Sequence, residues 1–352
     1  MRGIPSLVIL YGLFLCATTV HAQAPSANEL PPVAPASSGM EANSLLPPPT
    51  AATPGSDIRL VQGSANPNSN LRPDDVVRQG MQPGVDLECR PLLKTWATAF
   101  TFLPSGSGSH GFGVESIEGS ATFQIPFLDG HAPLLVRPGA GIHFWQQPTF
   151  GQPLYTFGMP KTVYDLYVDV GWQPRVADWL VLDLGITPGI YTDFNNTGDE
   201  AFRLRGRAVG IFCYSEEFQI VAGTAALNRD RFNWIPVFGV LWNPSPEWRV
   251  NLVFPESKIS YLAKRDGSRE WWVYVSSELG GGVWAVQRGG VLNDSVEYDD
   301  WRINLGVEWK SQYGVSGLVE VGYVFSRELF FQRPDFVFNV NNTVMLRVGL
   351  IF

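Results

Sequence analysis

Charge is scarce in this sequence. Charged residues make up 16% of the 352 residues, against roughly 25% in an ordinary soluble protein, so they are too few to cover a normal water-facing surface. The formal net charge is -8, which argues against a nucleic-acid partner, because such a partner favours a basic stripe. Histidine and cysteine are rare as well, at 4 and 3 residues, and they do not cluster at the spacing of metal ligands. We therefore expect no metal and no other cofactor.

Long hydrophobic runs are also lacking, except at the start of the chain. Beyond residue 22 no stretch approaches the ~18 consecutive apolar residues of a transmembrane helix. Residues 1–22 resemble a secretory signal, with Arg2, the apolar run "IPSLVILYGLFLCATTV" and a small-residue cleavage site after Ala22. Cys16 follows Leu15 rather than a small residue, which disfavours lipidation. We expect export and cleavage, with an uncleaved membrane anchor as the alternative.

Aromatic residues are almost absent from the segment that follows. After Gln23, residues 23–91 continue with "APSANELPPVAPASSGMEANSLLPPPTAATPGS", which is mostly proline, alanine and serine. Such a segment cannot bury enough apolar surface to offset the entropy of ordering. The sequence thus predicts a disordered periplasmic leader over 23–91 and a single folded domain over 92–352.

Apolar and polar residues alternate throughout that domain. The segment "TVYDLYVDVGWQ" places Leu166, Val168 and Val170 on one face, and "DWRINLGVEWK", "WLVLDLGI" and "FRLRGRAVGIFCY" show the same period of two. This period is typical of β-strands, and segments of about ten residues suit strands tilted across a bilayer. Trp and Tyr near the ends of the apolar faces, as at Tyr164 and Trp172, fit the aromatic girdles of membrane barrels.

The connections between these segments alternate in length. Short turns such as "PRVA" and "NPSP" interleave with longer ones such as "QQPTFGQPLYTFGMP", "GGGVWAVQRGGVLNDSVEYD" and residues 327–342. The pattern predicts an all-β fold, a closed antiparallel transmembrane β-barrel of about fourteen strands, with its short turns on the periplasmic side. Twelve strands are possible if the segments around "FPES" merge.

The last ten residues, "TVMLRVGLIF", have their own pattern. On one face of this strand lie Val344, Leu346, Val348, Leu350 and Phe352. The segment looks like the C-terminal sorting strand that the barrel-insertion machinery of bacteria reads. "NLVFPESKISYLAKRDGSREWWVYVSSELGGGVWAV" followed by "DWRINLGVEW" is similar to an uncharacterised family of predicted bacterial outer-membrane β-barrel proteins. The resemblance covers roughly 94–352; it implies the outer membrane as location and its lipid and the insertion machinery as partners, and transfers no activity.

Charged residues of both signs fall on the predicted inner face. These candidate lumen-lining residues are Arg203, Arg205, Arg207, Asp165, Asp169, Asp183, Glu118, Arg137, Glu308, Glu320 and Arg347. They could form a transverse field that orients small solutes, or interior ion pairs that fill the barrel and hold it rigid. Mixed signs argue against strong anion or cation selectivity.

A pore or transporter for small solutes is the function that this pattern favours. The alternatives are a closed barrel with binding or structural roles in its outer loops, and a secreted soluble β-protein. An enzyme is not expected, since His143 is the one histidine on a predicted inner face and no nucleophile can be assigned to it from spacing.

Two further features leave alternatives open. Cys89 and Cys213 could form a disulfide in an oxidising periplasm, or remain free thiols. The aromatic residues of the last long connection could contact an outside ligand, fold inward as a constriction, or simply extend two strands above the membrane; they are Phe330, Phe331, Phe336 and Phe338.

Overall fold

The computed structural model describes residues 93–106, 108–127, 132–148, 158–311 and 315–352, and these form one 16-stranded sheet. The predicted signal (1–22) and leader (23–91), with Cys89, lie outside the described residues. The strands are β1 (Leu93–Leu103), β2 (Gly113–Ile125), β3 (Leu134–Gln146), β4 (Thr162–Trp172), β5 (Arg175–Ala177), β6 (Leu180–Thr192), β7 (Phe202–Cys213), β8 (Phe218–Ala226), β9 (Trp234–Ser245), β10 (Trp248–Phe254), β11 (Ser257–Asp266), β12 (Arg269–Arg288), β13 (Leu292–Ser311), β14 (Ser316–Phe331), β15 (Phe336–Val340) and β16 (Thr343–Ile351). A 3-10 helix, η4 (Asp199–Ala201), precedes β7. Among the described residues no helix has the length and hydropathy to cross a membrane.

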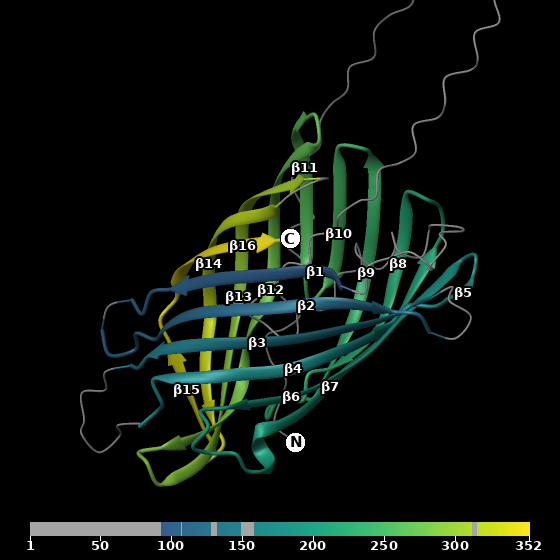
Figure 1. The fold of residues 1–352 in the computed structure, drawn as a ribbon. Helices are drawn as coiled ribbons and strands as arrows, with labels where there is room; N and C mark the ends of the chain where they lie inside the picture. The colour runs from purple at the N-terminus through teal and green to yellow at the C-terminus, as the bar shows by residue number, and fades with distance from the viewer. Residues whose placement is uncertain (1–92, 107, 128–131, 149–157, 312–314) are drawn as a thin grey trace, which may run out of the picture. The chain divides into compact units, whose positions relative to one another are not determined.

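The sheet closes into a barrel. Successive strands pair antiparallel from β1 to β14, with β4 paired directly to β6, and β16 then joins β14 to β1. The closing seam pairs Thr101 with Arg347 across β1 and β16, which lie side by side in Figure 1. The short strands β5 and β15 pair only with β6 and β14. Within the described residues the barrel wall therefore has fourteen strands, as predicted.

The alternative count of twelve strands is wrong. It depended on merging the segments on either side of "FPES", but β10 and β11 are separate antiparallel neighbours that pair Val250 with Ile259. Only Pro255 and Glu256 lie between them. A connection this short is compatible with two wall strands because antiparallel neighbours need only a tight turn.

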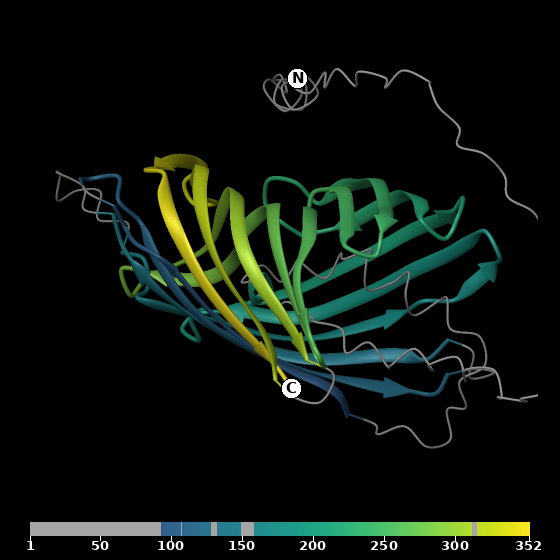
Figure 2. The same ribbon diagram turned by 90° about the horizontal axis from the view of Figure 1, so that it is seen from above.

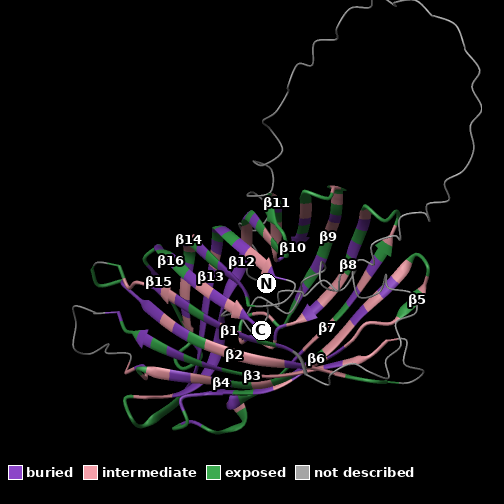
Figure 3. Ribbon diagram, turned by 45° about the horizontal axis from the view of Figure 1, so that its top comes forward, coloured by how far each residue is buried: buried purple, intermediate pink, exposed green. Residues whose placement is uncertain are grey.

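The outer face of the barrel is apolar. In β13 the side chains of Ile303 and Leu305 are 45% and 54% exposed, whereas Arg302 between its apolar neighbours is 3% exposed. The same alternation appears in β16 and along most wall strands, and Figure 3 shows it as successive exposed and buried bands. Apolar side chains outside and polar side chains inside are the arrangement of a transmembrane barrel.

Aromatic side chains gather near both ends of the wall. At the end that carries the short turns, Trp96 stacks on Phe352 with 4.8 Å between ring centroids. Further pairs at this end are Trp248–Tyr261 and Trp271–Trp309, and pairs at the opposite end are Tyr164–Phe194, Phe238–Phe254 and Tyr323–Phe325. Two such belts match the aromatic girdles at membrane interfaces. We call the two ends of the barrel the short-turn end and the long-loop end.

The long-loop end differs from the sequence prediction. The stretch 280–299, predicted as a loop, continues β12 and β13 as a hairpin whose turn lies at Gly289–Val291. Likewise β14 continues to Phe331 and pairs with β15, so most of 327–342 is strand rather than loop. The aromatic residues there thus lie on two extended strands, and of these residues Phe331 and Phe338 are buried, at 1% and 9% exposure.

These extensions bend away from the wall. Gly281 has a φ of +90°, a conformation that glycine adopts without steric cost. The β13–β14 pairing shifts register between Asp299 and Trp301, and Ser326 in β14 has a φ of 52°. We call the parts beyond these bends, residues 282–288, 292–298, 327–331 and β15, the mouth sheet. The curvature of β12 to β14 toward this end is visible in Figure 2.

Candidate functional site

The interior of the barrel is the candidate site. Whole-residue exposure is below 9% at Asp165, Asp169, Asp183, Arg203, Arg205, Glu308, Glu320 and Arg347. Arg207 has a side chain that is 7% exposed, while Glu118 and Arg137 are intermediate. The candidate residues come from eight wall strands, and three clusters of ion pairs account for most of them.

The first cluster is centred on Arg207 of β7. Its Nη1 donates to Asp169 Oδ1 at 2.8 Å and its Nε to Asp183 Oδ2 at 2.9 Å. Thr187 donates a further hydrogen bond to Asp169. A Cβ on Gly171 would come within 2.8 Å of Arg207 Nη2, so glycine leaves the space that the guanidinium occupies. Neighbouring strands β4, β6 and β7 are thereby joined across their inner face.

The second cluster joins β12, β13, β14 and β16. Glu278 Oε1 accepts from Arg347 Nη2 at 2.6 Å and from Arg302 Nη1 at 3.4 Å. Arg302 also pairs with Asp300, with 2.7 Å between Nε and Oδ1. Arg347 pairs in addition with Glu320, which accepts from the Tyr274 hydroxyl at 2.6 Å. Sequence analysis did not select Glu278, Asp300 or Arg302, because the partner strand and register of each residue were unknown.

The third cluster lies toward the short-turn end. Glu308 accepts from Lys258 at 2.5 Å and pairs with Lys310 at 2.9 Å. Lys258 Nζ lies 3.9 Å from the Tyr274 ring centroid, and Arg249 lies 3.8 Å from that of Trp272. Lysine and arginine are thus held against aromatic faces as well as against carboxylates.

His143 has a serine partner that spacing could not reveal. His143 Nδ1 lies 2.8 Å from Ser116 Oγ, and its Nε2 lies 3.1 Å from Asp165 Oδ2. Trp284 of the mouth sheet donates from Nε1 to Asp165 Oδ1 at 2.5 Å. Register explains the arrangement, because Ser116 pairs with His143 across β2 and β3. Ser116 is 1% exposed, and the chain of contacts ties the mouth sheet to the wall.

The mouth sheet crosses the long-loop end of the barrel. Ala285 of β12 pairs in parallel with Thr192 of β6, although the wall between these two strands contains β7 to β11. Residues 279–286 and 294–300 are buried at every position, without alternation. The contact therefore runs from one wall to the opposite wall, and both faces of the hairpin are covered.

Polar groups on the β6–β7 connection hold the hairpin in this position. The Asp193 amide donates to Ala285 O at 3.1 Å, and Asp193 Oδ2 accepts from the Gln287 amide at 2.9 Å. Asn196 Nδ2 lies 3.4 Å from Val286 O and 3.3 Å from Asp294 O. We call these contacts of Asp193 and Asn196 the latch.

The β8–β9 connection supports the base of the hairpin. Arg229 pairs with Asp299 through Nη1, and its Nη2 donates to Gly280 O at 3.2 Å. Burial lowers the pKa of Arg229 to about 10, and the charges of Arg205 and Arg302 oppose its protonation further. Arg229 thus stays cationic at neutral pH beside the Gly280 carbonyl.

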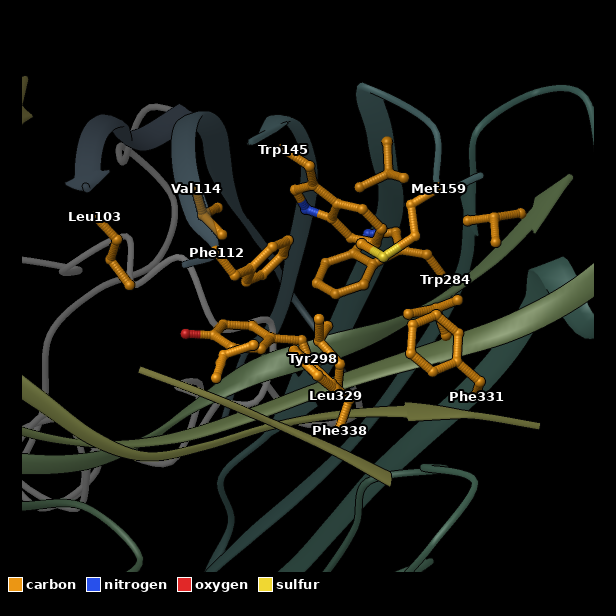
Figure 4. Close-up of a cluster of buried hydrophobic side chains, with 14 of the residues drawn as sticks. Leu103, Phe112, Val114, Trp145, Met159, Trp284, Tyr298, Leu329, Phe331 and Phe338 are labelled. Carbon is orange, nitrogen blue, oxygen red and sulfur yellow. The ribbon is translucent and has the colours of Figure 1, made fainter. Parts of the chain in front are cut away.

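An apolar cluster fills the space between the mouth sheet and the wall. Figure 4 shows Trp145 and Met159 from the wall side facing Trp284, with Phe112, Tyr298 and Phe331 around them. Trp145 and Trp284 meet edge to face at 5.3 Å between centroids, and Phe112 meets Tyr298 at 5.2 Å. Phe331 and Phe338 belong to this cluster, so these extended strands also contribute aromatic side chains to the mouth.

The remaining predicted site residues have less defined surroundings. Cys213 lies at the end of β7, half-buried and without a disulfide partner among the described residues; since Cys89 is outside them, the bridge stays a prediction. No group of three potential metal-binding side chains occurs in the part of the chain that the structure describes. In the proposed sorting strand, Val344 and Leu346 are exposed on the outer face.

Comparisons with known proteins add little beyond the barrel. No protein-family model matches the sequence, and no curated protein matches it either, so the resemblance to an uncharacterised family is not confirmed. Among solved structures, the chain is similar to KdgM porin, at 8% identity over 73% of this chain and 98% of the porin with a TM-score of 0.32. It is also similar to an outer-membrane channel from Pseudomonas putida F1, at 13% identity over 77% and 99% of the two chains with a TM-score of 0.35. It is similar as well to LpxR from Salmonella typhimurium, at 9% identity over 73% of this chain and 99% of LpxR with a TM-score of 0.34. These scores are low, and the barrel class rests on the strand pairing of this chain.

Proposed function

We propose that this protein is an outer-membrane pore for small solutes whose long-loop end is closed by the mouth sheet in the conformation described above. The observation that carries the proposal is the Ala285–Thr192 pairing across the barrel. Closure by bent extensions of wall strands, held by a small latch, is reversible in principle.

Barrel size supports a pore. Barrels of about 8 strands are just filled by side chains, whereas those of 16 to 18 strands leave an aqueous channel. Fourteen wall strands place this barrel between the two, and we propose that its side chains fill part of the lumen and leave a narrowed path. The charges along that path have both signs, which favours small polar or zwitterionic solutes over a strong preference for one sign.

Membrane insertion is part of the same proposal. The apolar outer face and two aromatic belts suit outer-membrane lipid. The final strand, with Val344 and Leu346 facing outward, suits recognition by the barrel-insertion machinery after export through a signal at 1–22.

The ion pairs themselves favour a second candidate function. Arg207, Arg302 and Arg347 each bind two carboxylates, and such a network also suits a rigid, non-conducting barrel that serves surface binding through its outer connections. The two functions differ in one measurable property, which is ion conductance.

The test uses a latch variant in planar lipid bilayers. Asp193→Ala combined with Asn196→Ala removes hydrogen bonds to the hairpin, each contributing about 1 kcal/mol. A combined loss of about 2 to 3 kcal/mol changes the ratio of open to closed channels roughly 30- to 150-fold. We expect rare conductance steps from the wild-type protein and frequent steps from the variant.

The control is Asp178→Ala, in an exposed ion pair with Arg175 near the short-turn end. It should behave as the wild type. Silence of all three proteins, each shown to be folded by heat-modifiable migration in detergent, would rule out the pore and leave the rigid barrel.

A further inference from the structure

Arg205 differs from the other arginines around it. Its Nε and Nη1 are buried and have no hydrogen-bond partner, and no described residue forms an ion pair with it. The residue is 6% exposed. A buried guanidinium without a counter-charge is strongly unfavourable, so a group that neutralises it is expected.

Nearby carboxylates are bound to other arginines. Asp230 pairs with Arg203 at 2.8 Å. Asp169 and Asp183 both bind Arg207, and Asp299 binds Arg229. These four carboxylates are thus bound to arginines other than Arg205, and Asp165 contacts His143 and Trp284.

Tyr191 supplies a second unpaired donor at the same place. The Arg205 guanidinium carbon lies over the Tyr191 ring, 4.0 Å from its centroid. The Tyr191 hydroxyl is buried and has no hydrogen-bond partner. A Cβ on Gly189 would come within 2.8 Å of Tyr191 Oη, so glycine at that position gives the ring its room.

We propose that Arg205 and Tyr191 form a binding site for an oxyanion, the carboxylate or phosphate group of a solute in the lumen. This inference deepens the proposed pore function by naming a substrate class, and it rests on that function. Guanidinium nitrogens match the geometry of a carboxylate or phosphate group, and the phenol adds a donor. Arg229 is close enough to Arg205 for their positive charges to interact, and this second positive charge also favours a bound anion.

The position of the site relates it to the mouth sheet. Arg203, two residues before Arg205 on the same face of β7, donates from Nη2 to Ser295 Oγ of the hairpin at 2.8 Å. The oxyanion site is therefore on the wall just beneath the cover, where a solute entering from the long-loop end arrives first.

The test is titration of the purified full-length protein in detergent with inorganic phosphate, followed by calorimetry at neutral pH in a chloride buffer. We expect saturable binding to the wild type. Arg205→Gln removes the charge and should weaken binding about tenfold or more, because hydrogen bonds to charged groups are strong. Tyr191→Phe should weaken it by a smaller factor, and Arg205→Lys should bind between Arg205→Gln and the wild type.

The matched control is Arg175→Gln, which removes an exposed arginine in β5 and should bind as the wild type. Each variant is first shown to be folded by heat-modifiable migration. The proposal is overturned if the wild type does not bind phosphate, or if Arg205→Gln binds phosphate as tightly as the wild type. The first result is expected if a carboxylate of this chain neutralises Arg205. Phosphate binding and ion conductance are measured independently. A protein that conducts ions but does not bind phosphate contradicts only this site, and a protein that binds phosphate but does not conduct ions contradicts only the pore.

Discussion

Glu278 is the carboxylate on which the second ion-pair cluster depends, and Glu278→Gln tests that role. The substitution keeps the side-chain volume and removes the charge that Arg347 and Arg302 share. Breaking a buried ion pair costs about 3 to 5 kcal/mol when a charge is left alone. Here Arg347 keeps Glu320 and Arg302 keeps Asp300, so neither charge is left alone and we expect a loss of at most about 3 kcal/mol.

The assay is urea unfolding in detergent micelles, followed by tryptophan fluorescence. A loss of about 3 kcal/mol corresponds to a change of roughly 150-fold in the ratio of folded to unfolded protein. Glu217→Gln, in the exposed β7–β8 turn, is the control and should change stability by less than about 0.5 kcal/mol. The double variant Glu278→Gln with Arg347→Met should cost less than the sum of the single variants, since the two side chains interact directly.

Equal stability of Glu278→Gln and Glu217→Gln would refute the reasoning. It would mean that the charge of Glu278 contributes nothing to the folded barrel. Additive effects in the double variant would likewise show that the contact between Glu278 and Arg347 is not energetically coupled.

Three further predictions concern the outer face, the bend and the cover. Leu305→Arg places a charge on the exposed outer side of β13 and should cost about 2 to 4 kcal/mol in a bilayer, depending on depth; unfolding from lipid vesicles measures it, and no loss would contradict lipid contact there. Gly281→Ala puts a Cβ against the Tyr298 carbonyl, at a residue with a φ of +90°, and should displace the hairpin. Faster proteolysis at the hairpin turn would reveal this displacement. Gly267→Ala, in an open turn with a φ of +56°, is the control for conformational strain alone. Trp284→Phe removes the hydrogen bond to Asp165 and should cost about 1 to 3 kcal/mol, with unchanged stability as the contrary result.

Period-two patterning predicted the wall well. Segments such as the one ending at Trp172 or beginning at Thr343 have one apolar and one polar face, because one side of each strand faces outward and the other faces the interior of the barrel. Strand bounds and the count of fourteen follow from this pattern together with loop lengths. The same pattern placed Arg207, Asp169 and Asp183 on the inner face of nearby strands, and the structure pairs Arg207 with both carboxylates.

The mouth sheet could not be predicted in this way. In "LGGGVWAV" the residues 279–286 are buried at every position, so no alternation marks them as strand. The reason is physical: once the hairpin leaves the wall, both of its faces contact protein. The run of three glycines, residues 280–282, is the one local signal compatible with a bend. The sequence around Ala285 does not indicate that this residue pairs with Thr192.

Partners in the lumen were also beyond sequence reasoning. Glu278 and Arg302 lie on adjacent strands, but Arg347 meets Glu278 across three successive strand pairings, β12–β13, β13–β14 and β14–β16. The hydrogen bond between Trp284 and Asp165 joins residues that are 119 positions apart. Strand pairing and the position of the mouth sheet decide these contacts, and neither can be obtained from the local sequence pattern.

Reversible cross-linking of the cover to the wall tests the gated pore most directly. In a background with Cys89→Ser and Cys213→Ser, the pair Thr192→Cys with Ala285→Cys joins two residues that are direct strand partners, within the ~7 Å between Cα atoms that a disulfide needs. We predict that oxidation abolishes conductance in planar bilayers and that reductant restores it, while either single cysteine variant is insensitive to both. Conductance that persists when the disulfide is fully formed would contradict the claim that the mouth sheet closes the lumen.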